Sequence, residues 1–171
     1  IQGVVDEGGF WPAFASNEEA IEVLLRSIEA AGYVPGNEVA ISLDIAASEL
    51  RDGQGYRLGL ESRSIDTDAM IEMLGRWLDR YPICSIEDPL AEDDPAGMQR
   101  FTEAFGSRVQ IIGDDFLVTN AQLVEAAASQ PACNAVLIKP NQVGTLSESL
   151  EAMQMARRFG WGTIVSARSG E

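Results

Sequence analysis

Short apolar runs, mostly of β-branched residues, alternate with amphipathic segments along the whole chain. The amphipathic segments repeat apolar residues every three or four positions, as helices packed on one face do, whereas the short runs are continuous, as in strands buried on both faces. This alternation predicts a parallel sheet with crossover helices. The expected strands are a first run ending at Val5 and the segments 39–43, 83–86, 109–112, 135–138 and 163–165.

Helix boundaries carry their own signals. Capping boxes predict helix starts at Ser16, with Glu19 three residues later, and at Thr145, with Glu148 in the same relation. The expected helices run from Ser16 to about Gly32 and over 70–81, 95–105, 120–130 and 146–159. The polar segment 51–64 interrupts the rhythm and predicts a small hairpin around Asp52 and Gly53.

About six strands with helical connections fit either a β/α barrel or a doubly wound sheet. No glycine-rich phosphate loop follows any strand, which disfavours the nucleotide-binding sheet. A complete barrel needs about eight such units in about 250 residues, and this chain has 171. We therefore expect an α/β fold in which residues 1–171 form a partial (β/α)8 TIM-type barrel, cut from a longer protein at both ends.

The charge balance limits the partners. With 27 acidic and 12 basic residues the formal net charge is −15, which disfavours nucleic acid and anionic lipid. No apolar run is long enough to span a membrane and no secretory signal is present, so we expect a cytoplasmic location. Histidine is absent, which disfavours the usual zinc sites, and Cys84 and Cys133 are expected to be free buried thiols.

Polar residues follow every expected strand at its carboxyl end, the face that carries the active site in β/α barrels. A single acid in such a place is more often a helix cap or a solvated loop charge, but a set of six argues for a site. The residues are Asp6-Glu7, Asp44, Glu87-Asp88, Asp114-Asp115, Lys139 and Ser166-Ala167-Arg168-Ser169.

Three of these carboxylates, those of Asp44, Glu87 and Asp114, directly follow an apolar run or a single glycine and should converge in the barrel mouth. They could not all remain ionised there without a cation. Hard oxygen ligands favour magnesium, with manganese as the alternative.

Lys139 is the only lysine among the 12 basic residues. It is either a fixed counterion of the acids or a general base, because positive neighbours and partial burial lower an amine pKa from about 10.4. Arg168, between two serines, suits a phosphate or carboxylate through its planar fork. Glu7, in a glycine-flanked loop, is the candidate acid that assists a leaving group. Together they suggest proton removal next to a carboxylate.

These motifs, in this order along the entire chain, resemble those of the enolase family. The matching segments are 6–10 (DEGGF), 43–49 (LDIAASE), 85–94 (SIEDPLAEDD), 113–115 (GDD), 137–145 (LIKPNQVGT) and 166–171 (SARSGE). The resemblance implies that Asp44, Glu87 and Asp114 hold magnesium. It also implies that Lys139 removes the proton from carbon 2 of 2-phosphoglycerate and that Glu7 helps the 3-hydroxyl leave.

The resemblance further implies that Ser166, Arg168 and Ser169 bind the substrate phosphate, so the substrate is a small phosphorylated carboxylic acid. A preceding α+β domain and a homodimer or higher homo-oligomer are also implied.

The chain departs from the family pattern at three positions. Ala167 stands where the family usually has histidine, Val5 where glycine is usual, and Pro95 where tryptophan is usual. Two further functions therefore stay open. One is an enolase relative with another substrate, such as a carboxyphosphonoenolpyruvate synthase of phosphonate biosynthesis, and the other is a non-catalytic relative that uses the fold for binding.

Overall fold

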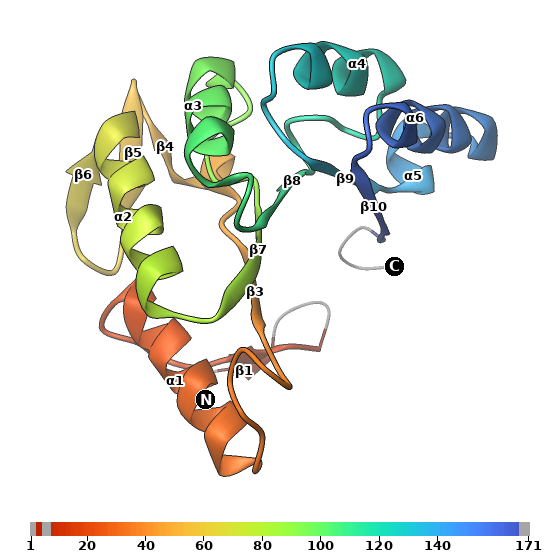
Figure 1. Ribbon diagram of the computed structural model, residues 1–171. Coiled ribbons are helices and arrows are strands. Elements are labelled where there is room, and N and C mark those ends of the chain that lie inside the picture. Colours follow the sequence, from red (N-terminus) through yellow and green to blue (C-terminus); the bar gives the residue numbers. More distant parts are fainter. Residues whose placement is uncertain (1–2, 5–7, 168–171) are drawn as a thin grey trace.

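A central parallel sheet organises the structure, a computed structural model that describes residues 3–4 and 8–167 (Figure 1). Its five strands lie in the order β10-β9-β8-β7-β3, each parallel to its neighbour. Each sequential strand is therefore added beside the previous one, as in a β/α barrel. The bounds are β3 Ile41–Asp44, β7 Ile83–Glu87, β8 Gln110–Gly113, β9 Ala135–Ile138 and β10 Gly162–Val165.

Helices connect these strands, and their caps confirm most of the expected boundaries. They are α1 Asn17–Ala30, α2 Thr67–Arg80, α3 Pro95–Phe105, α4 Ala121–Ser129, α5 Pro140–Val143 and α6 Leu146–Arg158. At α6 the Thr145 hydroxyl accepts from the N–H of Glu148 as expected, but the carboxylate of Glu148 accepts from that hydroxyl and not from the backbone N–H of Thr145. At α1 the Ser16 hydroxyl accepts from the N–H of Glu19, but the carboxylate of Glu19 accepts from the N–H of Ala15 instead of closing the box on Ser16.

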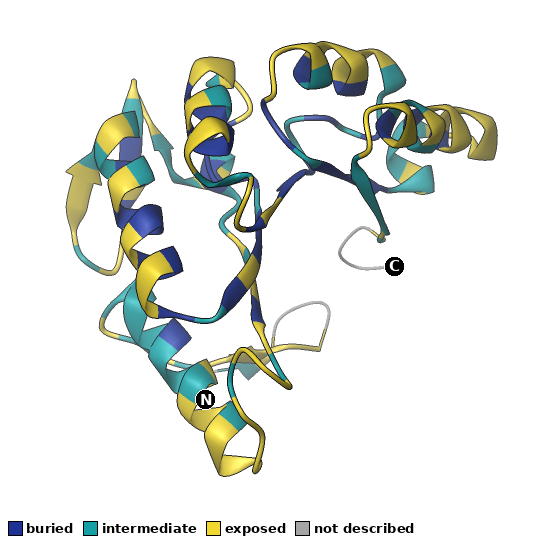
Figure 2. Cartoon of the chain, in the orientation of Figure 1, coloured by how far each residue is buried: buried dark blue, intermediate teal, exposed yellow. Residues whose placement is uncertain are grey.

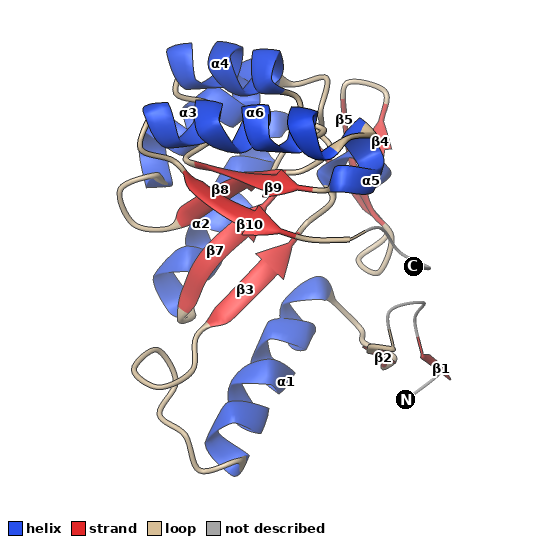
Figure 3. Cartoon of the chain, turned by 90° about the vertical axis from the view of Figure 1, so that its right-hand side faces the viewer, coloured by secondary structure: helices blue, strands red, loops and turns tan. Residues whose placement is uncertain are grey.

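The sheet is curved, and α2, α3, α4 and α6 lie along one of its sides (Figures 1 and 3). Their buried faces turn toward the strands, while their exposed faces point outward (Figure 2). Alternate strand residues such as Ile111 and Ile138 join the main core with helix residues such as Phe101, whereas Ile112 and Leu137 belong to a second, smaller cluster. β8 and β9 are thus apolar on both faces, which explains their continuous apolar runs.

The first apolar run was assigned to the wrong sheet. β1 Gly3–Val4 pairs antiparallel with β2 Phe10–Trp11 in a separate two-stranded sheet. The segment between the two strands is too short for the crossover that a parallel pair requires, so the chain folds back on itself. Phe10 and Trp11 are 76% and 58% exposed, so this hairpin adds no buried layer to the five-stranded sheet.

The polar segment after β3 is larger than the hairpin expected from the sequence. A 3-10 turn, Ala47–Leu50, leads into a three-stranded antiparallel sheet of β4 Arg51–Asp52, β5 Gly55–Leu58 and β6 Arg63–Ile65. Tyr56 and Leu58 of β5 are buried in the main core, so this insertion packs as part of the fold. None of the described helices combines the length and apolar character that crossing a membrane requires.

Both cysteines are free, but only Cys133 is buried. Cys84 is exposed on β7, where it lines a cavity together with Ser107 and Gly160.

Candidate active site

The carboxyl ends of the parallel strands surround one polar cavity. Asp44 at the end of β3 is the direct register partner of Glu87 at the end of β7. The residues that directly follow β8, β9 and β10 complete the rim of the cavity. The cavity has a volume of about 460 Å³ and is lined by Asp44, Ala46, Glu87, Asp88, Asp114, Asp115, Leu137, Lys139, Gln142, Ser166 and Ala167. The three carboxylates expected from the sequence and Lys139 therefore lie in the same cavity.

Burial disfavours charge on the first two carboxylates. Burial raises the pKa of Glu87 to about 8, and the negative charges of Asp44 and Asp114 add to the rise. Burial also raises the pKa of Asp44, although the N–H of Ala46, which donates to its Oδ1 at 2.9 Å, opposes the shift. The expectation that these acids cannot all remain ionised without a cation agrees with both directions.

Lys139 forms an ion pair with Asp114 across the cavity. Its Nζ lies 2.5 Å from Oδ2 of Asp114, and the two side chains are only 15% and 12% exposed. The expected lowering of its pKa is wrong. Burial lowers the pKa of Lys139, but the hydrogen bond to Asp114 and the charges of Asp114, Glu87 and Asp115 outweigh burial and raise it. The neighbours are carboxylates, not the positive groups that the sequence argument assumed.

Asp88 was not predicted as a site residue from the sequence, yet its hydrogen bonds connect the end of β7 to the loop that follows β8. It is 3% exposed, and its two carboxylate oxygens accept from the backbone N–H groups of Asp114 at 2.9 Å and Asp115 at 2.7 Å. Burial raises its pKa to about 7, against the effect of these hydrogen bonds. The pair of acids after β7 was the available signal, but sequence alone does not show which acid faces the cavity and which bonds the backbone.

Two carboxylate sets compete as cation ligands. Among the described residues, oxygens of Asp88, Asp114 and Asp115 lie within 4.8 Å of one another. The expected set, Asp44, Glu87 and Asp114, lines the same cavity. Because both oxygens of Asp88 already bond backbone N–H groups, we regard it as a group that orients the turn at Asp114.

Asp114 provides the test of whether a divalent cation fits. Its Oδ1 is buried and has no hydrogen-bond partner within the described part of the chain. A buried carboxylate oxygen without a partner is costly unless a cation or water occupies its lone pairs. Together with the raised pKa of Glu87, this oxygen makes the residues suitable for a hard divalent ion such as magnesium.

The remaining expected residues divide into two groups. Ser166 is half-buried at the rim of the cavity beside the exposed Ala167, and its N–H donates to the carbonyl of Ile138 at 3.0 Å. Glu7, Arg168 and Ser169 lie outside the described residues. Gln142, on the short helix α5, also lines the cavity and was not expected from the sequence.

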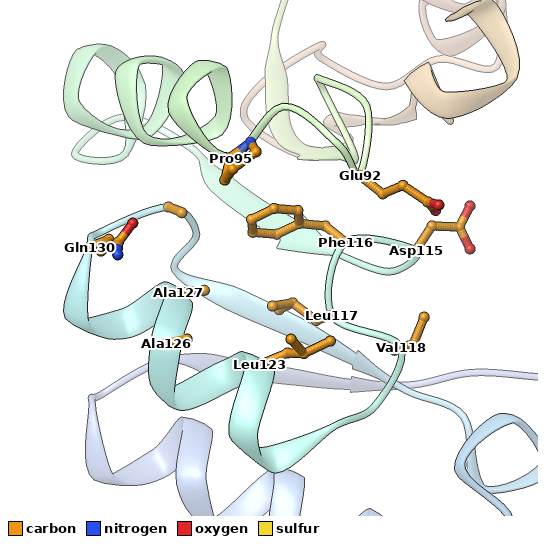
Figure 4. A pocket seen from close by; sticks show the side chains of 11 residues that line it. Glu92, Pro95, Asp115, Phe116, Leu117, Val118, Leu123, Ala126, Ala127 and Gln130 are labelled. Carbon is orange, nitrogen blue, oxygen red and sulfur yellow. The ribbon is translucent and has the colours of Figure 1, made fainter.

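A second cavity lies behind the loop that follows Asp114. It has a volume of about 470 Å³ and lies between the start of α3 and α4. Figure 4 shows Phe116, Leu117 and Val118 among its lining side chains, with Asp115 at the edge toward Glu92. The loop 114–119 therefore has one side toward the polar cavity and one side toward this mostly apolar cavity.

Comparison with known proteins agrees with this geometry. Residues 2–171 match the family model described as "Enolase, C-terminal TIM barrel domain". The chain belongs to the enolase family. This match confirms the expected α/β fold and its identity as a partial TIM-type barrel. The five-stranded parallel sheet is the part of the barrel that this chain forms.

Named enolases are similar to nearly the whole chain. It is 47% identical over 169 residues to "Enolase 1" of Methylococcus capsulatus, covering 98% of this chain and 40% of that protein. It is 45% identical over 168 residues to "Enolase 2" of Pseudomonas syringae pv. syringae, covering 98% and 39%. The chain thus spans about 40% of the length of the curated relatives that it matches, and these relatives suggest a lyase.

Proposed function

We propose that the longer protein containing this chain is a magnesium-dependent lyase that dehydrates 2-phospho-D-glycerate to phosphoenolpyruvate. The observation that carries the proposal is the ion pair of Lys139 and Asp114 inside a cavity bordered by further carboxylates. An amine and an incompletely bonded carboxylate oxygen lie together there, as proton abstraction beside a metal requires. The family relationship supports the reaction class.

In this proposal Asp44, Glu87 and Asp114 hold the magnesium, with manganese as the alternative. When bound, the ion would supply positive charge that stabilises the negative charge developing on the substrate carboxylate. Lys139 would hold its proton less tightly once Asp114 is a ligand, because the carboxylate charge that raises its pKa is then neutralised. The neutral amine then accepts the proton from carbon 2 of the substrate.

The rest of the proposal concerns the substrate phosphate and the leaving hydroxyl. Ser166, at the rim of the cavity, would bind the phosphate together with Arg168 and Ser169, and Glu7 would protonate the departing 3-hydroxyl. A homodimer or larger homo-oligomer in the cytoplasm belongs to the same proposal.

The test is the reaction itself in the full-length protein. With magnesium and 2-phosphoglycerate we expect the ultraviolet absorbance of enolpyruvate to rise, and the Lys139→Ala variant to lose this activity. Absence of product at high enzyme concentration would contradict the substrate. Equal turnover in the alanine variant would contradict the role of Lys139, and a protein without any turnover would favour a binding function.

An altered substrate is the second candidate, because Ala167 lines the cavity with a methyl group where a histidine could donate hydrogen bonds. A phosphonate-containing substrate, as in carboxyphosphonoenolpyruvate synthesis, is the proposed alternative. Ala167→His should then shift the substrate preference of the full-length protein toward 2-phosphoglycerate. Unchanged preference and turnover in that variant would remove the support for this candidate.

A further inference from the structure

We propose that Thr119 is a positioning residue that fixes the backbone of Lys139 and thereby the location of its amine in the cavity. Thr119 lies in the loop between β8 and α4, twenty residues before Lys139. The inference rests on the proposed function in one respect, the role of Lys139 as the base.

The hydroxyl of Thr119 lies within hydrogen-bonding distance of three polar groups near the end of β9. Thr119 is 1% exposed, and its Oγ1 accepts from the N–H of Lys139 at 2.9 Å. The same hydroxyl lies 3.3 Å from the carbonyl oxygen of Leu137 and 3.4 Å from Oε1 of Gln142, so its single proton can serve either acceptor. One buried side chain thus lies within hydrogen-bonding distance of β9, the lysine after it and the short helix α5.

Lys139 needs such a partner because it follows the last residue of its strand. β9 ends at Ile138 and α5 begins at Pro140, so Lys139 is neither in the ladder nor in the helix. Pro140 also restricts the backbone of Lys139, which has φ −118° and ψ 93°. The Thr119 hydroxyl accepts from the Lys139 N–H, which has no partner in the strand ladder. This hydrogen bond fixes the backbone of Lys139 and so the direction of its side chain.

The loop is held in an unfavourable conformation that presents this hydroxyl. Val118 and Thr119 have φ values of 42° and 55°, in the left-handed region that β-branched residues rarely adopt. The N–H groups of Leu117 and Val118 donate to the carbonyl of Asp114 at 3.1 Å and 2.7 Å, which closes the turn. Backbone strain that persists under such constraint is concentrated at functional sites.

The apolar side of the same loop anchors it. Leu117 is 1% exposed and lies with Phe116 on the wall of the second cavity (Figure 4). The loop therefore binds Lys139 at two points, through Asp114 at the ammonium and through Thr119 at the backbone N–H. The amine must leave Asp114 before it takes a substrate proton, and the Thr119 hydrogen bond does not depend on the charge of the amine.

The experiment compares Thr119→Val, which keeps the shape and removes the hydroxyl, with Thr119→Ser, which keeps the hydroxyl. Thr102→Val is the matched control, because Thr102 is 9% exposed and its buried Oγ1 has no hydrogen-bond partner among the described residues. The full-length protein is assayed with magnesium for kcat, KM and the isotope effect of deuterium at carbon 2. Hydrogen exchange of the Lys139 amide is measured without metal or substrate.

We expect Thr119→Val to lower kcat by at least about tenfold with KM changed less than about threefold, because small displacements of a reacting group are costly. Its isotope effect and Lys139 amide exchange should increase. Thr119→Ser and Thr102→Val should stay within about threefold of the unmodified protein in kcat. Thr119→Ala takes the place of the valine variant if that variant fails to fold.

Two results would overturn the inference, and both differ from failure of the proposed function. The first is unchanged kcat and amide exchange in the variants that lack the hydroxyl, while Lys139→Ala is inactive. The second is an equal loss in Thr119→Ser, since a side chain that retains the hydroxyl should rescue the activity. Full activity of Lys139→Ala would instead reject the base assignment.

Discussion

Asp44 and Glu87 occupy paired register positions at the carboxyl ends of β3 and β7, so two carboxylates stand side by side in one cavity. Two neighbouring negative charges in a partly buried place repel each other and lose water. The fold therefore holds these groups at a cost that a bound cation would offset. The first two predictions follow from this cost.

The metal-free protein should become less stable as the pH rises from about 5 to about 8. Burial raises the pKa of Glu87 to about 8 and that of Asp88 to about 7, above their ordinary values of 4.5 and 3.8. For a raised pKa the stabilisation is complete below the pKa of the unfolded chain and is lost as the pH passes through the pKa of the folded state. Between about pH 5 and about pH 8, Asp88 should lower the free energy of unfolding by on the order of 3 kcal/mol. Denaturant titrations of the full-length protein in chelator measure it.

Glu87→Gln isolates one of these contributions, because glutamine does not titrate. The free energy of unfolding of this variant should fall less between about pH 5 and about pH 8 than that of the unmodified protein. Asp52→Asn is the control, since Asp52 is exposed in the three-stranded sheet and should leave the difference unchanged. If Glu87→Gln shows the same fall with pH as the unmodified protein, Glu87 does not carry the raised pKa.

Magnesium should stabilise the full-length protein against thermal unfolding, by about 2.7 kcal/mol at a concentration one hundred times its Kd. Asp114→Asn should abolish this gain, because Asp114 belongs to both candidate ligand sets and has a buried oxygen without a partner among the described residues. The shift in melting temperature with and without the ion is the measurement. Asp52→Asn again serves as the control.

The same measurement separates the two ligand sets. If Asp44, Glu87 and Asp114 hold the ion, Asp44→Asn should lose most of the gain and Asp115→Asn should keep it. The opposite result, loss in Asp115→Asn alone, would assign the ion to the compact group of Asp88, Asp114 and Asp115. Each outcome identifies one set, so the experiment does not depend on activity.

The sequence predicted the parallel strands and the residues at their ends because both follow from local patterns. Apolar runs buried on both faces are visible as continuous stretches, and the residue after each run lies at the carboxyl edge whichever way the sheet curves. β9 was predicted to the residue, Ala135–Ile138. The positions of Asp44 and Lys139 in the cavity followed from strand ends alone.

The remaining features depend on contacts between distant segments. The bonds of Asp88 to backbone N–H groups, and of Thr119 to Lys139, join residues 20 to 27 positions apart and leave no periodic trace. The short helix α5 has only four residues, too few for a hydrophobic repeat. The pKa of Lys139 was predicted in the wrong direction because its sign depends on which charges the fold brings near.

Gly113→Ala should destabilise the full-length protein by about 1–3 kcal/mol, because a methyl group at this position overfills the core. A Cβ on Gly113 would lie 2.6 Å from Cδ1 of Leu117 and 3.2 Å from Sγ of Cys133, and both neighbours are at most 2% exposed. Leu117 anchors the loop that holds Lys139, so the substitution should also lower kcat. Denaturant titration and steady-state kinetics measure the two effects.

Gly59→Ala is the matched control, because a Cβ there meets nothing within 4 Å. That variant should match the unmodified protein in both stability and kcat. Adding Leu117→Ala to Gly113→Ala should cost less than the sum of the two single changes, since the smaller side chain makes room for the new methyl group. Strict additivity, or a Gly113→Ala variant as stable as Gly59→Ala, would show that the contact between Gly113 and Leu117 does not hold the loop.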